Sequence, residues 1–202
     1  MGYYLRVLAK STATVPVSRL RQRLEKDGLK VVLECSTDEG SAWTKLLMKH
    51  RNGDPIADIE RNEVAPGSLA FDELIEFADD IEECKPATAV KWLREFFKTV
   101  KAIYAFQILR GADRGKGWDG IWAVEGELWG ALGGILQSDN EGFSNEDGYS
   151  ILWQFEDHVR GPWKMAVLSP DGHWTAFEMN LGNRAHREAF FSGEVPEGVP
   201  RL

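Results

Sequence analysis

The sequence predicts an α+β protein made of two similar β-α-β-β-β-α units, with mainly antiparallel sheets and helices packed on them. Three observations lead to this prediction. Strand-like and helix-like segments alternate along the 202 residues, the same order of elements recurs in both halves, and two hairpin-like segments carry a similar pattern of residues. We place the first unit, with a connecting helix, at residues 1–100 and the second at residues 101–202, and we expect both to pack as one globular body.

Hydrophobic periodicity and turn chemistry predict each element of the first half. Alternating or β-branched residues indicate strands, whereas apolar residues three and four apart indicate helices. The pair Asn52-Gly53 is typical of a hairpin turn. The predicted strands cover 3–10, 30–35 and the two arms of a hairpin at 43–62, and the predicted helices cover 16–27, 67–83 and 87–100.

The second half repeats this order of elements. A strand at 102–109 precedes a helix rich in tryptophan, which is followed by two strands, a hairpin and a short helix. Both hairpins begin with Trp, turn at a Gly and carry Ala four residues after that Gly. This likeness favours an internal duplication about a pseudo-twofold axis, although limited turn chemistry alone makes hairpins look alike. These later elements are predicted at 118–132, 133–137, 149–156, 163–180 and 183–191.

Composition and charge argue against several classes of protein. The net charge of −8 at pH 7 disfavours nucleic-acid binding, which needs a basic footprint. Residues 1–33 carry seven bases against two acids, which we interpret as a small solvated basic face, with local contact to a polyanion as the less favoured alternative. The apolar stretches are far shorter than the roughly 18 residues that indicate a membrane span. The chain begins without a signal peptide's apolar segment, and Cys35 and Cys84 share no metal or redox spacing, so we expect buried free thiols in a cytoplasmic protein.

The segment Asp139–Asp147 raises the question of a cation site, because it carries four acids and no base. A calcium loop needs oxygen ligands at alternate positions, but the fifth position counted from Asp139 is Phe143. We therefore expect an acidic, exposed loop whose tip is anchored by Phe143, with a metal site as the less favoured alternative. The prediction is that the protein holds no metal and no cofactor.

Local motifs for catalysis are lacking in the sequence. There is no phosphate-binding Gly-Lys-Ser/Thr, no His-Glu-x-x-His and no Gly-x-Ser-x-Gly. The four histidines stand beside charged residues or in turns, as solvated histidines often do. We therefore assign no catalytic residue. An enzyme of unknown reaction remains one hypothesis, because a catalytic cleft that is assembled in space leaves no local pattern.

A predicted acidic helix at 69–83 favours a binding protein. We expect a buried side of apolar residues and an exposed side of carboxylates, which would form an acidic ridge that steers a basic partner. The plain alternative is an ordinary solvated helix. The expected buried set is Phe71, Leu74, Ile75, Ala78 and Ile81, and the expected exposed binding set is Asp72, Glu76, Asp79, Asp80 and Glu83.

Tryptophan is the second feature that favours binding, because six of the eight lie between residues 118 and 174. Most should fill the core, but one or two at a surface would suit the enrichment of tryptophan at binding sites. We therefore add Trp118, Trp122 and Phe143 to the candidate binding residues. The leading hypothesis is a cytoplasmic, non-enzymatic binding protein, such as an inhibitor or immunity-type partner of a basic toxin or nuclease. The alternative is a small apolar ligand bound in an aromatic groove between the halves.

Overall fold

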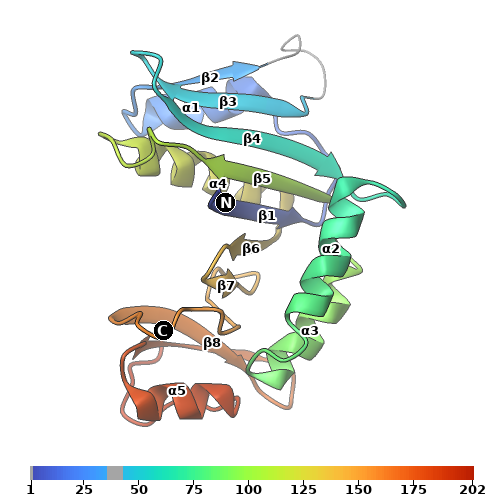
Figure 1. Cartoon of the computed structure of the whole chain (residues 1–202), viewed down its shortest axis with the longest axis vertical. Coiled ribbons are helices and arrows are strands. Elements are labelled where there is room, and N and C mark those ends of the chain that lie inside the picture. The colour runs from blue at the N-terminus through green and yellow to red at the C-terminus, as the bar shows by residue number, and fades with distance from the viewer. Residues whose placement is uncertain (1, 36–42) are drawn as a thin grey trace. The chain divides into compact units, whose positions relative to one another are not determined.

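The computed structural model describes residues 2–35 and 43–202 and divides the chain into two compact units. Unit 1 comprises Met1–Phe71 and Val100–Gly134, and unit 2 comprises Asp72–Thr99 and Ile135–Leu202. Each unit therefore takes segments from both halves of the sequence. Figure 1 shows the helices and strands and labels all of them except β9.

Unit 1 is an antiparallel sheet with two helices on one face. Its strands lie in the order β2-β3-β4-β5-β1, and every neighbouring pair is antiparallel. Helices α1 and α4 contact each other as well as strands of this sheet, so they cover the same face (Figure 1). The elements are β1 (Tyr4–Ala9), α1 (Val17–Lys26), β2 (Val31–Cys35), β3 (Lys45–His50), β4 (Pro55–Glu63), β5 (Ala102–Ile108) and α4 (Gly117–Leu132).

Helix α1 packs on the core of unit 1 as its sequence spacing predicts. It buries Val17, Leu20 and Leu24, which are three and four residues apart and share one side of the helix. Pro16 precedes the helix, where its fixed φ and missing N–H cost little. Gly28 follows with a positive φ of 67°, a conformation that ends a helix and that glycine adopts readily. The opposite side of α1 is thereby left to polar residues.

Unit 2 combines helices with two antiparallel strand pairs. β6 pairs with β7, and β8 pairs with β9 along its full length. Buried apolar residues of β8, β9 and α5 form a core cluster there. Helix α2 begins in the last residues of unit 1 and has most of its length in unit 2. The elements are α2 (Leu69–Asp80), α3 (Ala87–Phe97), β6 (Gly134–Ser138), β7 (Gly142–Phe143), β8 (Pro162–Leu168), β9 (Trp174–Asn180) and α5 (Arg184–Phe191).

Helix α5 begins at an asparagine cap, which provides a local test of the fold. The side-chain oxygen of Asn183 accepts hydrogen bonds from the backbone N–H groups of Ala185 at 3.0 Å and His186 at 3.4 Å. We expect Asn183→Ala to lower the free energy of unfolding by about 1 kcal/mol, because these donors lose their acceptor. Urea denaturation measures the change. Asn183→Ser keeps a capping oxygen and should recover most of the loss, so equal losses in the two variants would argue against capping.

The α+β class with mainly antiparallel strands is confirmed, but one predicted strand, at residues 149–156, is wrong. These residues form no ladder. Their backbone N–H groups bond to three different segments instead. Ser150 donates to a carbonyl of β8, Ile151 donates to a carbonyl of β7, and Trp153 donates to the Lys85 carbonyl. The side chains of Ile151 and Leu152 are fully buried. The apolar pattern of residues 149–156 therefore indicates burial in the core and not strand pairing. The sequence also does not predict β7.

The structure does not show the predicted internal duplication. After α1, strands β2, β3 and β4 form one antiparallel run, which β5 extends. After α4, the strands form the pairs β6-β7 and β8-β9. The two similar hairpins also differ in register, since the β3-β4 ladder shifts between Met48 and Lys49 whereas the β8-β9 ladder runs without a shift. Shared turn chemistry accounts for their likeness in sequence.

Candidate functional site

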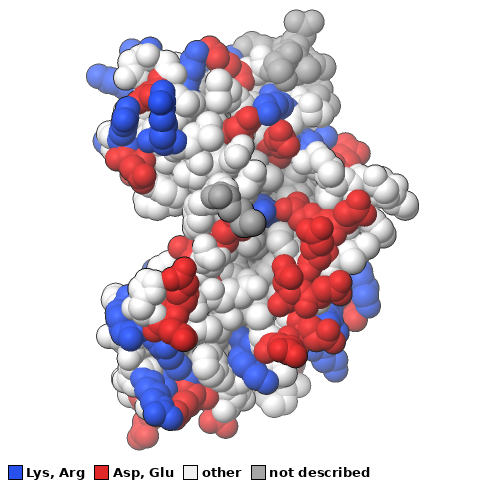
Figure 2. Space-filling view, viewed as in Figure 1, with Lys and Arg blue, Asp and Glu red and all other residues white. Residues whose placement is uncertain are grey.

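The exposed side of α2 carries a row of carboxylates. We define the acidic face as Asp72, Glu76, Asp79 and Asp80 of α2, together with Glu83 shortly after the helix; all five are exposed. Residues three and four apart share one side of a helix, which explains why they lie together. Figure 2 shows carboxylates gathered along the part of the protein that α2 occupies in Figure 1. The exposure expected from the sequence is confirmed for these residues, and their role in binding stays a prediction.

Apolar side chains are exposed on the same helix as the acidic face. Leu69, Phe71 and Ile75 are 74%, 37% and 49% exposed. Among the described residues, three of the five large apolar side chains that are exposed lie on this one helix. Protein-binding surfaces commonly combine an apolar contact point with a charged and polar rim. The composition of the α2 surface therefore resembles that of a protein interface.

The prediction that Phe71 and Ile75 are buried is wrong. The buried stripe runs through Ala70, Leu74 and Ile81, which are 1%, 7% and 0% exposed. Successive residues of a helix are rotated by about 100°, so Phe71 and Ile75 lie to one side of Ala70 and Leu74 and face solvent. The sequence identified the helix, but it could not tell which of two adjacent apolar stripes packs on the core.

Local stability does not account for the charge of the acidic face. In the part of the chain that the structure describes, Arg94 pairs with Glu82 at 3.6 Å, but no ion pair involves the five carboxylates of the acidic face. Asp79 and Asp80 occupy the last turn of α2, where the helix dipole favours cations, and no base stands in that turn. Like charges four residues apart, as at Glu76 and Asp80, also destabilise a helix. The carboxylates in the second half of α2 therefore lower stability, which favours a role for them outside the fold.

Reversing the charge at the end of α2 should consequently stabilise the protein. Asp79→Lys with Asp80→Lys places cations in the last turn and brings one of them four residues after Glu76. We expect the free energy of unfolding to rise by about 0.5–2 kcal/mol. Chemical denaturation measures the rise. The matched control is Glu194→Lys with Glu197→Lys, two exposed carboxylates beyond α5, which should change stability by about 0.5 kcal/mol or less. A clear loss of stability in the α2 variant would show that its carboxylates are structural.

The candidate tryptophans Trp118 and Trp122 lie on α4 in unit 1. Trp122 is 58% exposed, whereas the other five tryptophans between 118 and 174 are half-buried. The ring centroids of Trp118 and Trp122 are 5.9 Å apart, and Tyr3 contacts Trp118 edge-on at 6.3 Å. The Trp118 indole Nε1 donates a hydrogen bond to Asp113 at 2.9 Å. Of the two candidate tryptophans, Trp122 therefore has the more exposed side chain.

Phe143 is a core residue rather than the anchor of an exposed loop. It lies in β7, is 2% exposed, and packs its ring against Phe77 at 5.3 Å and Phe97 at 5.5 Å between centroids. The acidic segment around it is partly a short hairpin, in which Asn140 takes a positive φ of 63° between β6 and β7. Asparagine tolerates this conformation better than most residues. We therefore leave Phe143 out of the binding surface.

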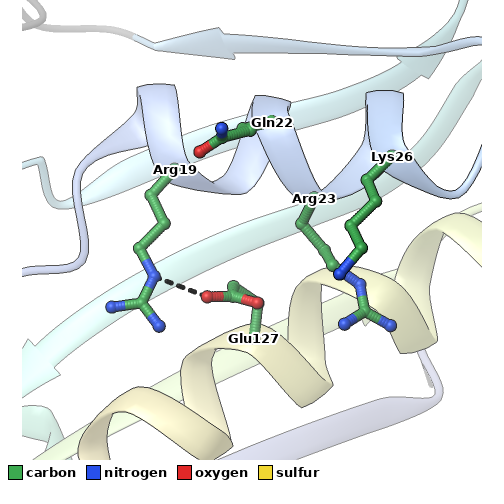
Figure 3. A pocket seen from close by; sticks show the side chains of 5 residues that line it. All are labelled: Arg19, Gln22, Arg23, Lys26 and Glu127. Atoms are coloured by element: carbon green, nitrogen blue, oxygen red, sulfur yellow. Dashed lines mark hydrogen bonds and ion pairs between the residues drawn. The ribbon is translucent and has the colours of Figure 1, made fainter.

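A groove between α1 and α4 brings together basic side chains of the segment that is predicted to be a solvated basic face (Figure 3). Its volume is about 430 Å³. The Arg19 Nε donates to the Glu127 carboxylate at 2.5 Å and so links the two helices. The spacing on α1 could have shown that the bases share one side, but the partner on α4 is not visible locally. We call this the cationic groove; it is lined by Arg19, Gln22, Arg23, Lys26 and Glu127.

Groups that often serve catalysis or metal binding are scattered in the described residues. No three His, Cys, Asp or Glu side chains gather there in a way that could hold a metal ion. His158 pairs with Glu156 at 3.1 Å, but their side chains are 82% and 60% exposed. Cys35 and Cys84 form no disulfide within the described residues and are half-buried rather than fully buried as predicted, and burial raises the pKa of the Cys84 thiol. Within the described chain, every helix is too short or too polar to cross a membrane.

No family model, curated protein or solved structure matches the chain. Function is therefore argued from the surfaces themselves. The α2 surface combines exposed carboxylates with exposed apolar side chains, and the cationic groove is an open groove of about 430 Å³ lined mainly by basic side chains.

Proposed function

We propose that the protein binds a basic protein through the acidic face of α2 and the exposed apolar residues beside it. The observation that carries this proposal is the exposure of Leu69, Phe71 and Ile75 on the helix that also bears the acidic face. Carboxylates attract a cationic surface and raise the association rate. Apolar side chains that become buried in the complex then slow dissociation.

A nuclease or toxin with a cationic site is the class of partner that fits this surface best. Proteins that act on nucleic acids place Lys and Arg where phosphates bind. A row of carboxylates on a helix presents anions to such a site, and an inhibitor or immunity-type protein would act by covering it. The end of α2 is tied to α3, because Arg94 donates to the Ala78 carbonyl at 3.2 Å. The net charge of −8 adds long-range attraction.

Binding of a small apolar ligand has less support. That function needs a deep apolar pocket lined by tryptophans, whereas the cationic groove is lined by charged and amide side chains. Trp122, the most exposed of the six clustered tryptophans, lies open on α4. An open tryptophan suits contact with a protein better than enclosure of a small molecule.

Affinity capture with three baits tests the proposal. The baits are the unaltered chain, the Asp79→Lys/Asp80→Lys variant and the Glu194→Lys/Glu197→Lys control, each incubated with extract of the native host. We expect a basic protein that is retained by the unaltered chain and by the control but is lost from the α2 variant. The same set of captured proteins on all three baits, or a selectively lost partner that is acidic, would overturn the proposal.

A further inference from the structure

We infer that the cationic groove between α1 and α4 binds a small phosphate monoester. This inference does not depend on the acidic face, which lies on another helix. Arg19, Gln22, Arg23 and Lys26 stand at positions i, i+3, i+4 and i+7 of α1, on the side opposite the buried apolar stripe. Figure 3 shows the basic side chains extending from α1 toward α4, where Glu127 meets Arg19.

Two carboxylates hold the arginines by Nε and leave the ends of their guanidinium groups open. The Arg19 Nε donates to Glu127 at 2.5 Å, and the Arg23 Nε donates to Asp27 at 2.8 Å. Within residues 2–35 and 43–202, no hydrogen bond or ion pair involves the Nη atoms of either arginine or the Lys26 ammonium group. A guanidinium oriented in this way presents paired N–H donors, which match the oxygens of a phosphate group.

The energetics of an isolated helix explain only part of this arrangement. Arg23 and Lys26 stand in the last turn of α1, where cations interact favourably with the helix dipole. Arg19 stands in the first turn, where the dipole disfavours a cation, and it reaches across to α4. The three bases are paired with only two carboxylates, Glu127 and Asp27, so a positive charge is left over that a bound anion would balance.

The size and lining of the groove define the class of ligand. Its volume of about 430 Å³ lies within the range of small-molecule sites and exceeds the size of a free phosphate ion. A phosphate monoester is largely dianionic at neutral pH and would lie between Arg19 and Arg23. The Gln22 amide and the Glu127 carboxylate can hydrogen-bond to hydroxyl groups on the organic part. A small phosphate monoester that carries hydroxyl groups therefore matches both the basic and the polar side chains of the lining.

Isothermal titration with glycerol phosphate tests this inference. We expect saturable binding at one site, and Arg19→Gln with Arg23→Gln should weaken it by about tenfold or more, because two charge-assisted contacts are lost. The matched control is Lys91→Gln with Lys98→Gln, which removes the same charge from an exposed position of α3 and from the exposed residue that follows it, and it should change affinity by less than about twofold. Absence of saturable binding to the unaltered chain, or equal weakening in both variants, would overturn the inference.

Two further variants keep the test decisive if the double variant does not fold. Lys26→Gln removes a base that no ion pair holds within the described residues, and it should weaken binding severalfold with at most a small fall in thermal stability, because only its interaction with the helix dipole is lost. We expect the unaltered chain to bind glycerol phosphate more tightly than inorganic phosphate. Glu127→Gln should reduce this difference in affinity, because it replaces the carboxylate that accepts hydrogen bonds from the hydroxyl groups of the ligand. If Glu127→Gln instead tightens the binding of both probes equally, the assigned ligand class is wrong.

Discussion

Replacing Arg61 by methionine should lower the free energy of unfolding by about 2–4 kcal/mol. Arg61 lies in β4 and is 6% exposed. Its Nε donates to the Tyr104 hydroxyl at 3.1 Å, and its Nη2 donates to the Thr12 carbonyl at 2.7 Å and to Glu63 at 2.6 Å. Hydrogen bonds from a charged group are stronger than neutral ones. Methionine keeps much of the apolar contact of the arginine stem. The fall in the free energy of unfolding therefore measures mainly the loss of the polar contacts.

The effect is large because Arg61 belongs to a network that holds the connection between β1 and α1. The Tyr104 hydroxyl donates to the Ala13 carbonyl at 3.2 Å, and the Trp43 indole donates to the Val15 carbonyl at 2.8 Å. Burial raises the pKa of the Tyr104 hydroxyl, which therefore stays protonated and able to donate. Since this connection leads into α1, the network also supports the position of the cationic groove.

Urea denaturation measures the loss, with Glu63→Gln as the matched control. The Glu63 side chain is 56% exposed, so its pairing with Arg61 should contribute about 1 kcal/mol or less. The expected result is a much larger loss for Arg61→Met than for Glu63→Gln. Equal losses would mean that the exposed ion pair matters more than the buried hydrogen bonds, which is contrary to our interpretation.

Truncating Phe143 to alanine should lower the free energy of unfolding by about 3–5 kcal/mol, because it leaves a cavity against Phe77 and Phe97. The matched control is Phe71→Ala on α2, where the side chain is 37% exposed and the loss should be about 0.5–1 kcal/mol. Denaturation of both variants separates a core residue from a surface one. A comparable fall in the free energy of unfolding for both variants would show that Phe143 does not lie in the core. Phe71→Ala should, in contrast, speed dissociation of a bound partner.

Most helices and hairpins were predictable because their signals are local. The stripe of Val17, Leu20 and Leu24 defines α1, and the Asn52-Gly53 pair lies in the turn of the β3-β4 hairpin. Residues 149–156 show where this reasoning fails. Their side chains are buried as a strand's would be, but their backbone partners belong to three separate segments. No local pattern encodes such partners.

The two candidate surfaces, the acidic face and the cationic groove, also differ in whether the sequence predicts them. The acidic face was predictable because helical spacing alone determines which carboxylates share a side. The cationic groove was not, because Arg19 and Glu127 are 108 residues apart and meet only when α4 packs on α1. The position of Phe143 has a related cause: its acidic neighbours indicate an exposed loop, but the pairing of β7 with β6 places it in the core.

The association rate with the captured partner is the most direct test of the proposal that the acidic face binds a basic protein. It should be measured by stopped flow for the unaltered chain, the Asp79→Lys/Asp80→Lys variant and the Glu194→Lys/Glu197→Lys control, at low and at high salt. We expect the α2 variant to associate about tenfold or more slowly than the unaltered chain at low salt, and clearly more slowly than the control. High salt should bring the three rates together, because ions screen charges over about 10 Å at 0.1 M. An association rate that is unchanged at low salt, or slowed equally in the control, would contradict the proposal.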